Sequence, residues 1–185
     1  MLKWGLPAGA ILALVILVFF RMGANTGAPE AQATTAPLGS PAMPDISAMS
    51  PEERADRLFN RVMQYWSEGK SDSAAFFAPM AITSIEALTP RTLHLHYDLG
   101  LVALASGDLA RASAEADTIL KGNPTHLLGL ALAARVADAR SDKSAATAAR
   151  QKLLASEKSE RAKALPEYGD HDSDLRAAID LARKQ

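Results

Sequence analysis

Hydrophobic and polar positions divide the chain into three stretches with different patterns. Residues 4–20 are apolar and carry no charge, whereas residues 23–50 contain almost no large apolar side chain. Residues 51–185 repeat apolar side chains at helical spacing between capping and breaking signals. These patterns predict an all-α protein with an N-terminal transmembrane helix, a disordered linker and a helical domain.

The apolar segment WGLPAGAILALVILVFF covers residues 4–20 and is flanked by Lys3 and Arg21. A helix over residues 4–22 would be about 30 Å long, which matches the hydrocarbon thickness of a bilayer. We therefore expect residues 1–22 to form a transmembrane anchor that contacts the lipid bilayer through residues 4–22. A cleaved signal peptide and a buried soluble helix are the alternatives, but the long apolar run and the arginine directly after it favour the anchor.

The charges at the two ends of this segment predict its orientation. Lys3 and the free amino group together outweigh Arg21, so the positive-inside rule places the N-terminus in the cytoplasm. The C-terminal domain is then extracytoplasmic. The high content of Ala, Leu and Arg fits a bacterium, and we expect a single-pass protein of the bacterial inner membrane.

Residues 23–50 form the predicted linker between the anchor and the domain. They are rich in Ala, Pro, Gly, Ser and Thr, so no core can offset the entropy of ordering them. As a coil, 28 residues would span about 30 Å root mean square. We expect this flexible linker to hold the domain clear of the lipid headgroups.

Capping and breaking residues divide residues 51–185 into helices. The sequence Ser50-Pro51-Glu52-Glu53 is a capping box that predicts a helix start at Pro51. A second helix follows residues 71–73, and Pro79 predicts a break in it near Ala78. Further helices are predicted over residues 91–106, 108–121 and 143–163, then a loop over EYGDHDSD and a terminal helix with apolar residues Leu175, Ala178, Ile179 and Ala182.

Small residues and a proline recur at regular intervals in YDLGLVALASGDLARASAEADTILKGNP, residues 97–124. The spacing resembles the tetratricopeptide repeat, in which small side chains let two antiparallel helices pack closely. The resemblance covers residues 51–160 and implies a solenoid of about three helix pairs with a C-terminal capping helix. In this resemblance the repeat-packing residues are Leu99, Gly100, Gly107, Ala112, Ala116, Pro124, Ala134 and Ala146.

The repeats to either side align less well with this copy. A shift of 34 residues, the tetratricopeptide period, carries Gly100 onto Ala134 and the turn residue Gly107 onto Ser141. Towards the N-terminus, the matching turn glycine is Gly69, which lies 38 residues before Gly107. The register of the first pair therefore stays open.

The resemblance also implies a concave groove lined by the first helix of each pair. Phe59, Met63 and Leu104 are expected in the core rather than in contact with a partner. The groove candidates for binding a protein or peptide partner are His94, Tyr97, Leu101, Arg135 and Asp138.

Charge and composition exclude several functions. Lys plus Arg is 20 and Asp plus Glu is 21, and neither sign forms a long run, which argues against nucleic-acid binding. The absence of cysteine removes disulfides, thiolate catalysis and cysteine-based zinc sites. No Gly-rich phosphate loop or nucleophile elbow is present, so we predict no catalysis and no cofactor.

The positions of histidine and aspartate predict no metal site. His94 and His96 lie two residues apart, so about 200° separates them on a helix and they cannot share an ion. The run from Asp170 to Asp174 resembles a calcium loop but lacks the glycine and glutamate that an EF-hand requires. We expect Asp172 or Ser173 to cap the last helix instead.

The sequence thus predicts a membrane-tethered scaffold for protein–protein interaction on the extracytoplasmic side. One alternative is a self-associating structural component of the cell envelope, a homo-oligomer. Another is an accessory or sensor subunit of an envelope complex.

Overall fold

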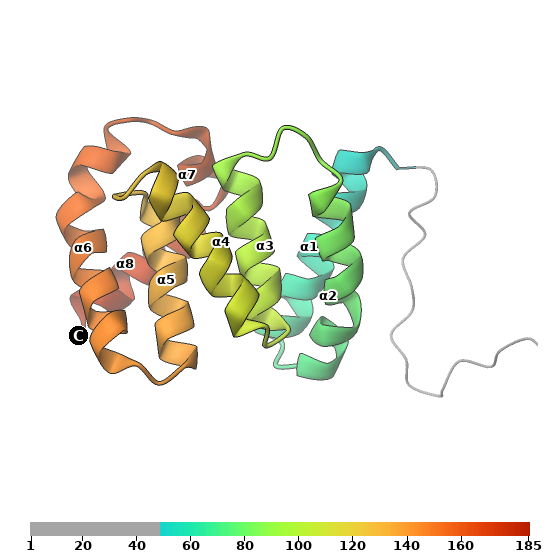
Figure 1. Ribbon diagram of the computed structural model, residues 1–185, viewed down its shortest axis with the longest axis horizontal. Coiled ribbons are helices and arrows are strands. Elements are labelled where there is room, and N and C mark those ends of the chain that lie inside the picture. Colours follow the sequence, from blue (N-terminus) through green and yellow to red (C-terminus); the bar gives the residue numbers. More distant parts are fainter. Residues whose placement is uncertain (1–48) are drawn as a thin grey trace, which may run out of the picture. The chain divides into compact units, whose positions relative to one another are not determined.

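The computed structural model describes residues 49–185, which form eight helices and no strand (Figure 1). The all-α prediction is therefore confirmed for this part of the chain. The anchor predicted over residues 1–22 and nearly all of the linker over residues 23–50 lie outside the described residues. Between residues 49 and 185, every helix is too short or too polar to cross a bilayer.

Six helices form three antiparallel pairs that follow one another in chain order (Figure 1). The pairs are α1 (Pro51–Ser67) with α2 (Ser71–Glu86), α3 (Leu93–Ala105) with α4 (Leu109–Gly122), and α5 (Leu127–Ala139) with α6 (Lys143–Arg161). Successive pairs pack through α2 on α3 and α4 on α5, and α3 also contacts α1 and α5. The chain ends with the short helix α7 (Pro166–Asp170) and with α8 (Asp172–Arg183).

The same turn joins the two helices of each pair. Gly69, Gly107 and Ser141 have φ angles of 70°, 82° and 60°, in the left-handed region. In each turn the next residue donates a backbone hydrogen bond of 2.8–2.9 Å to the carbonyl five residues earlier, which defines a Schellman motif. The three pairs therefore have equivalent turns, at the offsets of 38 and 34 residues that the sequence alignment used.

For the first two helices, the predicted capping box is confirmed and the predicted break is wrong. The capping box is present, since Ser50 Oγ accepts from the Glu53 N–H and Glu53 Oε2 accepts from the Ser50 N–H. The break predicted near Ala78 is wrong, because α2 continues as one helix through Pro79. Pro79 and Ala75 both lie on the exposed side, where water can satisfy the carbonyl that loses its partner.

Glycines allow two close approaches between pairs. A Cβ atom added to Gly100 on α3 would lie 2.2 Å from Leu132 Cδ2 on α5. One added to Gly129 on α5 would lie 2.7 Å from Ile119 Cγ2 on α4. Gly100 thus serves packing between successive pairs. Among the other small residues of the predicted pattern, Ala112, Ala116, Ala134 and Ala146 are buried, whereas Pro124 is exposed directly after α4.

The C-terminal segment packs on α5 and α6 and completes the core of the second and third pairs. The apolar face predicted for the last helix is confirmed, because Leu175, Ile179 and Ala182 are buried and Ala178 packs against them. Two details are corrected. Part of the predicted loop is the helix α7, and α8 has no side-chain cap, since its N-cap position is His171.

A buried carboxylate joins α6, α7 and the connection between α4 and α5. Glu160 accepts hydrogen bonds from Lys163 (2.6 Å), Tyr168 (2.8 Å), Asn123 (3.1 Å) and Thr125. Burial raises the pKa of Glu160, but these donors outweigh it and lower the pKa to about 2. Tyr168 Oη also accepts from the Leu127 N–H at 3.2 Å, so this network fixes α7 against the start of α5.

The turns give a first prediction. Gly107→Ala should lower the free energy of unfolding by about 1 kcal/mol, because a left-handed backbone is unfavourable for a residue with Cβ. Ser141→Gly should raise it by several tenths of a kcal/mol, up to about 1 kcal/mol, for the same reason. Urea unfolding of the two variants and the parent chain measures both changes. If both substitutions raised or both lowered the free energy of unfolding, the turns would not be equivalent.

Candidate functional site

A cavity of about 780 Å³ opens on the side of the array formed by α1, α3 and α5. The helices α7 and α8 contribute its remaining wall through residues at their junction. The lining residues are Phe59, Met63, Trp66 and Ser67 from α1, Leu101 and Leu104 from α3, Arg135, Asp138 and Ala139 from α5, and Asp170, His171, Ser173 and Asp174 from the junction.

The wall formed by α1 and α3 is apolar. Phe59, Met63 and Leu104 are only partly buried, so they pack against the core and also face the cavity. The sequence predicts these three residues in the core rather than at a binding surface. In the structure they belong both to the core and to the cavity wall. Trp66 leaves 37% of its surface exposed at this wall, so its ring is accessible to a partner.

The opposite wall is charged and is held by an ion pair between α5 and α8. Arg135 Nη1 donates to Asp174 Oδ2 at 3.0 Å, and its Nη2 donates to Asp174 Oδ1, which makes the pair bidentate. The Tyr97 hydroxyl of α3 also donates to Asp174 Oδ2. One carboxylate thus links α8 to two helices of the array.

Burial and the charge of Arg135 shift the pKa values of Asp174 and Tyr97 in opposite directions. Burial raises the pKa of the Asp174 carboxyl, but the hydrogen bonds and the positive charge of Arg135 outweigh it and lower the pKa below its ordinary value. Burial is also the main reason that the pKa of Tyr97 lies well above its ordinary value. Tyr97 therefore stays a neutral donor to an ionised Asp174 at neutral pH.

The predicted groove residues occupy different environments. Leu101, Arg135 and Asp138 line the cavity, and Asp138 also pairs with Arg150 of α6. Tyr97 is fully buried beneath the C-terminal segment and is not free surface. His94 does not line the cavity, but it lies beside it in a polar cluster.

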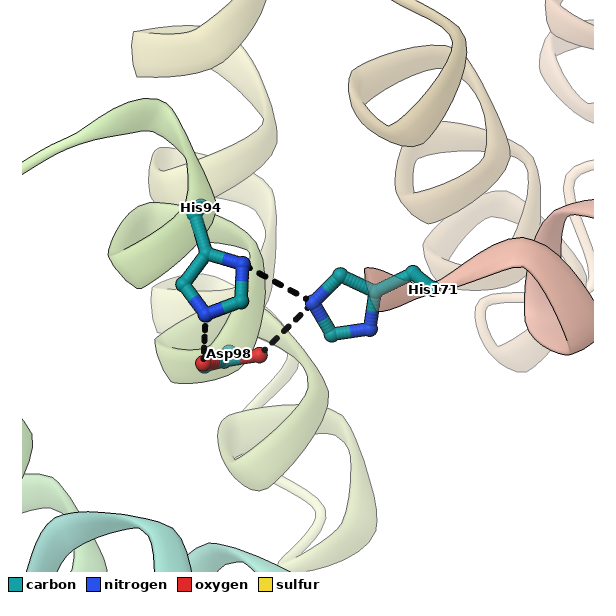
Figure 2. Close-up of side chains that lie close together, drawn as sticks. All are labelled: His94, Asp98 and His171. Carbon is teal, nitrogen blue, oxygen red and sulfur yellow. Dashed lines mark hydrogen bonds and ion pairs between the residues drawn. The ribbon is translucent and has the colours of Figure 1, made fainter. Parts of the chain in front are cut away.

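This cluster joins His94 and Asp98 of α3 with His171 of the α7–α8 junction (Figure 2). His94 Nε2 lies 3.3 Å from Asp98 Oδ2, and His171 Nε2 lies 3.3 Å from Asp98 Oδ1. The two imidazoles meet at 3.2 Å between His171 Nε2 and His94 Nδ1. His171 also packs edge-on against the Tyr97 ring, so the cluster and the ion pair are adjacent.

Sequence reasoning missed this cluster because it treated His94 and the run from Asp170 to Asp174 separately. His94 was compared with His96, which points elsewhere and pairs with Glu115 at 2.7 Å. The informative signal was the spacing of four residues between His94 and Asp98, which places both side chains on one helix face. No spacing in the sequence could indicate that His171, 77 residues from His94, completes the group.

The ion pair gives a second prediction. Asp174→Asn should lower the free energy of unfolding at neutral pH by about 2 kcal/mol, because Arg135 loses its charged partner. The folded-state pKa of Asp174 is lowered, so its stabilising effect is complete above the ordinary carboxyl pKa and is lost as the pH falls through the lowered value. The difference from the parent chain should therefore shrink in acid.

Asp180→Asn is the matched control on the same helix. The Asp180 side chain is 63% exposed and lies 3.7 Å from Arg183, so its loss should change stability by less than about 0.5 kcal/mol. Urea unfolding at several pH values measures both variants. An Asp174→Asn variant as stable as Asp180→Asn at neutral pH would contradict this role of the ion pair.

Comparisons of the chain with protein-family models, with curated proteins and with solved structures give no match. The resemblance to tetratricopeptide repeats stays a prediction from the sequence.

Proposed function

We propose that this chain is a membrane-tethered, tetratricopeptide-like scaffold that binds a segment of a protein partner in the cavity. The observation that carries this proposal is the cavity itself, with an apolar wall from α1 and α3 that faces a charged wall from α5 and the α7–α8 junction. Cavities that combine apolar area with a few placed polar groups are typical of peptide recognition.

The arrangement of the helices supports the comparison with tetratricopeptide repeats. Three helix pairs are stacked in chain order, and the turn of each contains one residue in the left-handed region. The first helices of all three pairs contribute to the cavity. Stacked helix pairs with a binding surface on their concave side are characteristic of such arrays. The terminal helix α8 buries the apolar side of α5 and α6, as a capping element does.

The volume and charge of the cavity define the partner segment. About 780 Å³ is in the range of small-ligand pockets, so it accommodates a few side chains rather than a whole helix. The charged lining residues are Arg135 and three aspartates. Arg135 and Asp174 neutralise each other and Asp138 pairs with Arg150, which leaves the negative charge of Asp170. The proposed ligand is therefore a short segment with one or two large apolar side chains next to Lys or Arg.

The proposed location follows from the N-terminal residues. An anchor over residues 1–22 and a linker over residues 23–50 would present the domain on the extracytoplasmic side of a bacterial inner membrane. In this arrangement the scaffold recruits or organises a partner outside the cytoplasm, and it performs no catalysis.

Peptide selection tests the binding function. A random peptide library displayed on phage is selected against the full chain, and enriched peptides are measured by fluorescence anisotropy. We expect enriched sequences with an apolar residue beside a basic one. Trp66→Ala should weaken their binding by roughly tenfold or more, as is usual for aromatic anchors at binding surfaces.

Phe76→Ala is the matched control, because Phe76 is 49% exposed on α2 and does not line the cavity. It removes a similar exposed aromatic side chain without changing the proposed site, so binding should be unchanged. Equal losses in the Trp66 and Phe76 variants, or no enrichment at all, would contradict the proposal.

Protease accessibility tests the proposed location. In spheroplasts of bacteria that express the full chain, added protease should digest residues 51–185, and the undigested protein should fractionate with the membrane. Protection of the domain until the membrane is lysed would indicate the opposite orientation, with the domain in the cytoplasm. Release of a soluble, shortened chain would indicate a cleaved signal peptide.

A further inference from the structure

We propose that His94, Asp98 and His171 bind one divalent transition-metal ion, with zinc as the preferred ion. This proposal rests on a different observation from the proposed peptide binding, although His171 also lines the cavity. The three residues are the candidate metal-ligand group among residues 49–185, since a ligand atom from each lies within 4.8 Å of the others.

Two of the separations between possible ligand atoms match a tetrahedral ion. Zinc binds imidazole nitrogen and carboxylate oxygen at about 2.0–2.2 Å, and tetrahedral geometry then separates the ligand atoms by roughly 3.3–3.6 Å. His171 Nε2 lies 3.2 Å from His94 Nδ1 and 3.3 Å from Asp98 Oδ1. Figure 2 shows the three side chains converging from α3 and from the α7–α8 junction.

One arrangement of protons in this cluster leaves an oxygen of Asp98 without a full hydrogen bond. If His94 donates its Nε2 proton to Asp98 Oδ2, its Nδ1 is free to accept the single Nε2 proton of His171. Asp98 Oδ1 then has no donor. If both imidazoles are fully protonated, two N–H groups point at each other across 3.2 Å.

Asp98 Oδ1 lacks a hydrogen bond within the described residues. Asp98 is 6% exposed, and its Oδ1 atom has no hydrogen-bond partner although His171 Nε2 lies 3.3 Å away. An unpartnered buried carboxylate oxygen is costly. A cation held between Asp98 and the two histidines would give this oxygen a partner.

His94 Nε2 also lies 3.3 Å from Asp98 Oδ2, so the carboxylate is within reach of both histidines. Two imidazoles and one carboxylate suit zinc and its neighbours, whereas calcium and magnesium prefer ligand sets made of oxygen.

The site would connect distant parts of the chain. Two ligands lie one turn apart on α3, and the third precedes α8, so a bound ion would fix the α7–α8 junction on the array. His171 also lines the cavity, so the metal would hold the position of one of its walls. A fourth ligand position is left for water.

Zinc binding to the full chain, stripped with chelator and then dialysed, tests the proposal. We expect binding of one Zn²⁺ per chain by isothermal titration calorimetry. At a hundredfold excess over Kd, the thermal unfolding midpoint should rise by roughly 5–10 °C. His171→Gln and Asp98→Asn should lose this shift, whereas His96→Gln, on the same helix but outside the cluster, should keep it.

Side-chain NMR of the parent chain provides a test that needs no variant. Zinc should change the ring ¹⁵N signals of His94 and His171 and leave those of His96 and His126 unchanged. No zinc-dependent shift in the folded parent chain would overturn the proposal. So would an equal shift in folded His171→Gln, or zinc-dependent signals from His96 or His126 alone.

Discussion

The contact of the α7–α8 junction with α3 is the interaction on which the candidate sites depend. Tyr97 and Asp98 are adjacent buried residues of α3, and each faces a polar side chain from the C-terminal segment, Asp174 and His171. Buried polar groups of this kind must find partners, and this requirement fixes the position and rotation of α8 more narrowly than apolar packing does. The cavity wall and the histidine cluster follow from that position.

The two proposed sites share this junction but use different chemistry. The cavity offers apolar area from α1 and α3, where Trp66 stays partly exposed. The cluster of His94, Asp98 and His171 offers lone pairs that the protein does not satisfy by itself. An ion at the cluster would stabilise the same wall that a peptide contacts, so the two occupants would be linked energetically.

Local signals in the sequence predicted most of the helical elements. The capping box at Ser50, the turn residues Gly69 and Gly107 and the apolar face of the last helix are all present, because each depends on neighbouring residues only. Pro79 was misjudged, since the cost of a proline depends on whether water reaches the carbonyl it leaves unpaired. The sequence predicts Tyr97 at the groove surface, because its position in the repeat carries no information on the C-terminal segment that covers it.

Paired helices can be predicted from the sequence, since capping, turn conformation and amphipathic period each depend on residues within one repeat. The places where polar side chains meet can be known only from the way the helices pack. Asp174 reaches Tyr97 across 77 residues and Arg135 across 39, and His171 reaches His94 across 77. Contacts at such separations depend on how the pairs stack and how the last helix folds back, and no local pattern encodes that geometry.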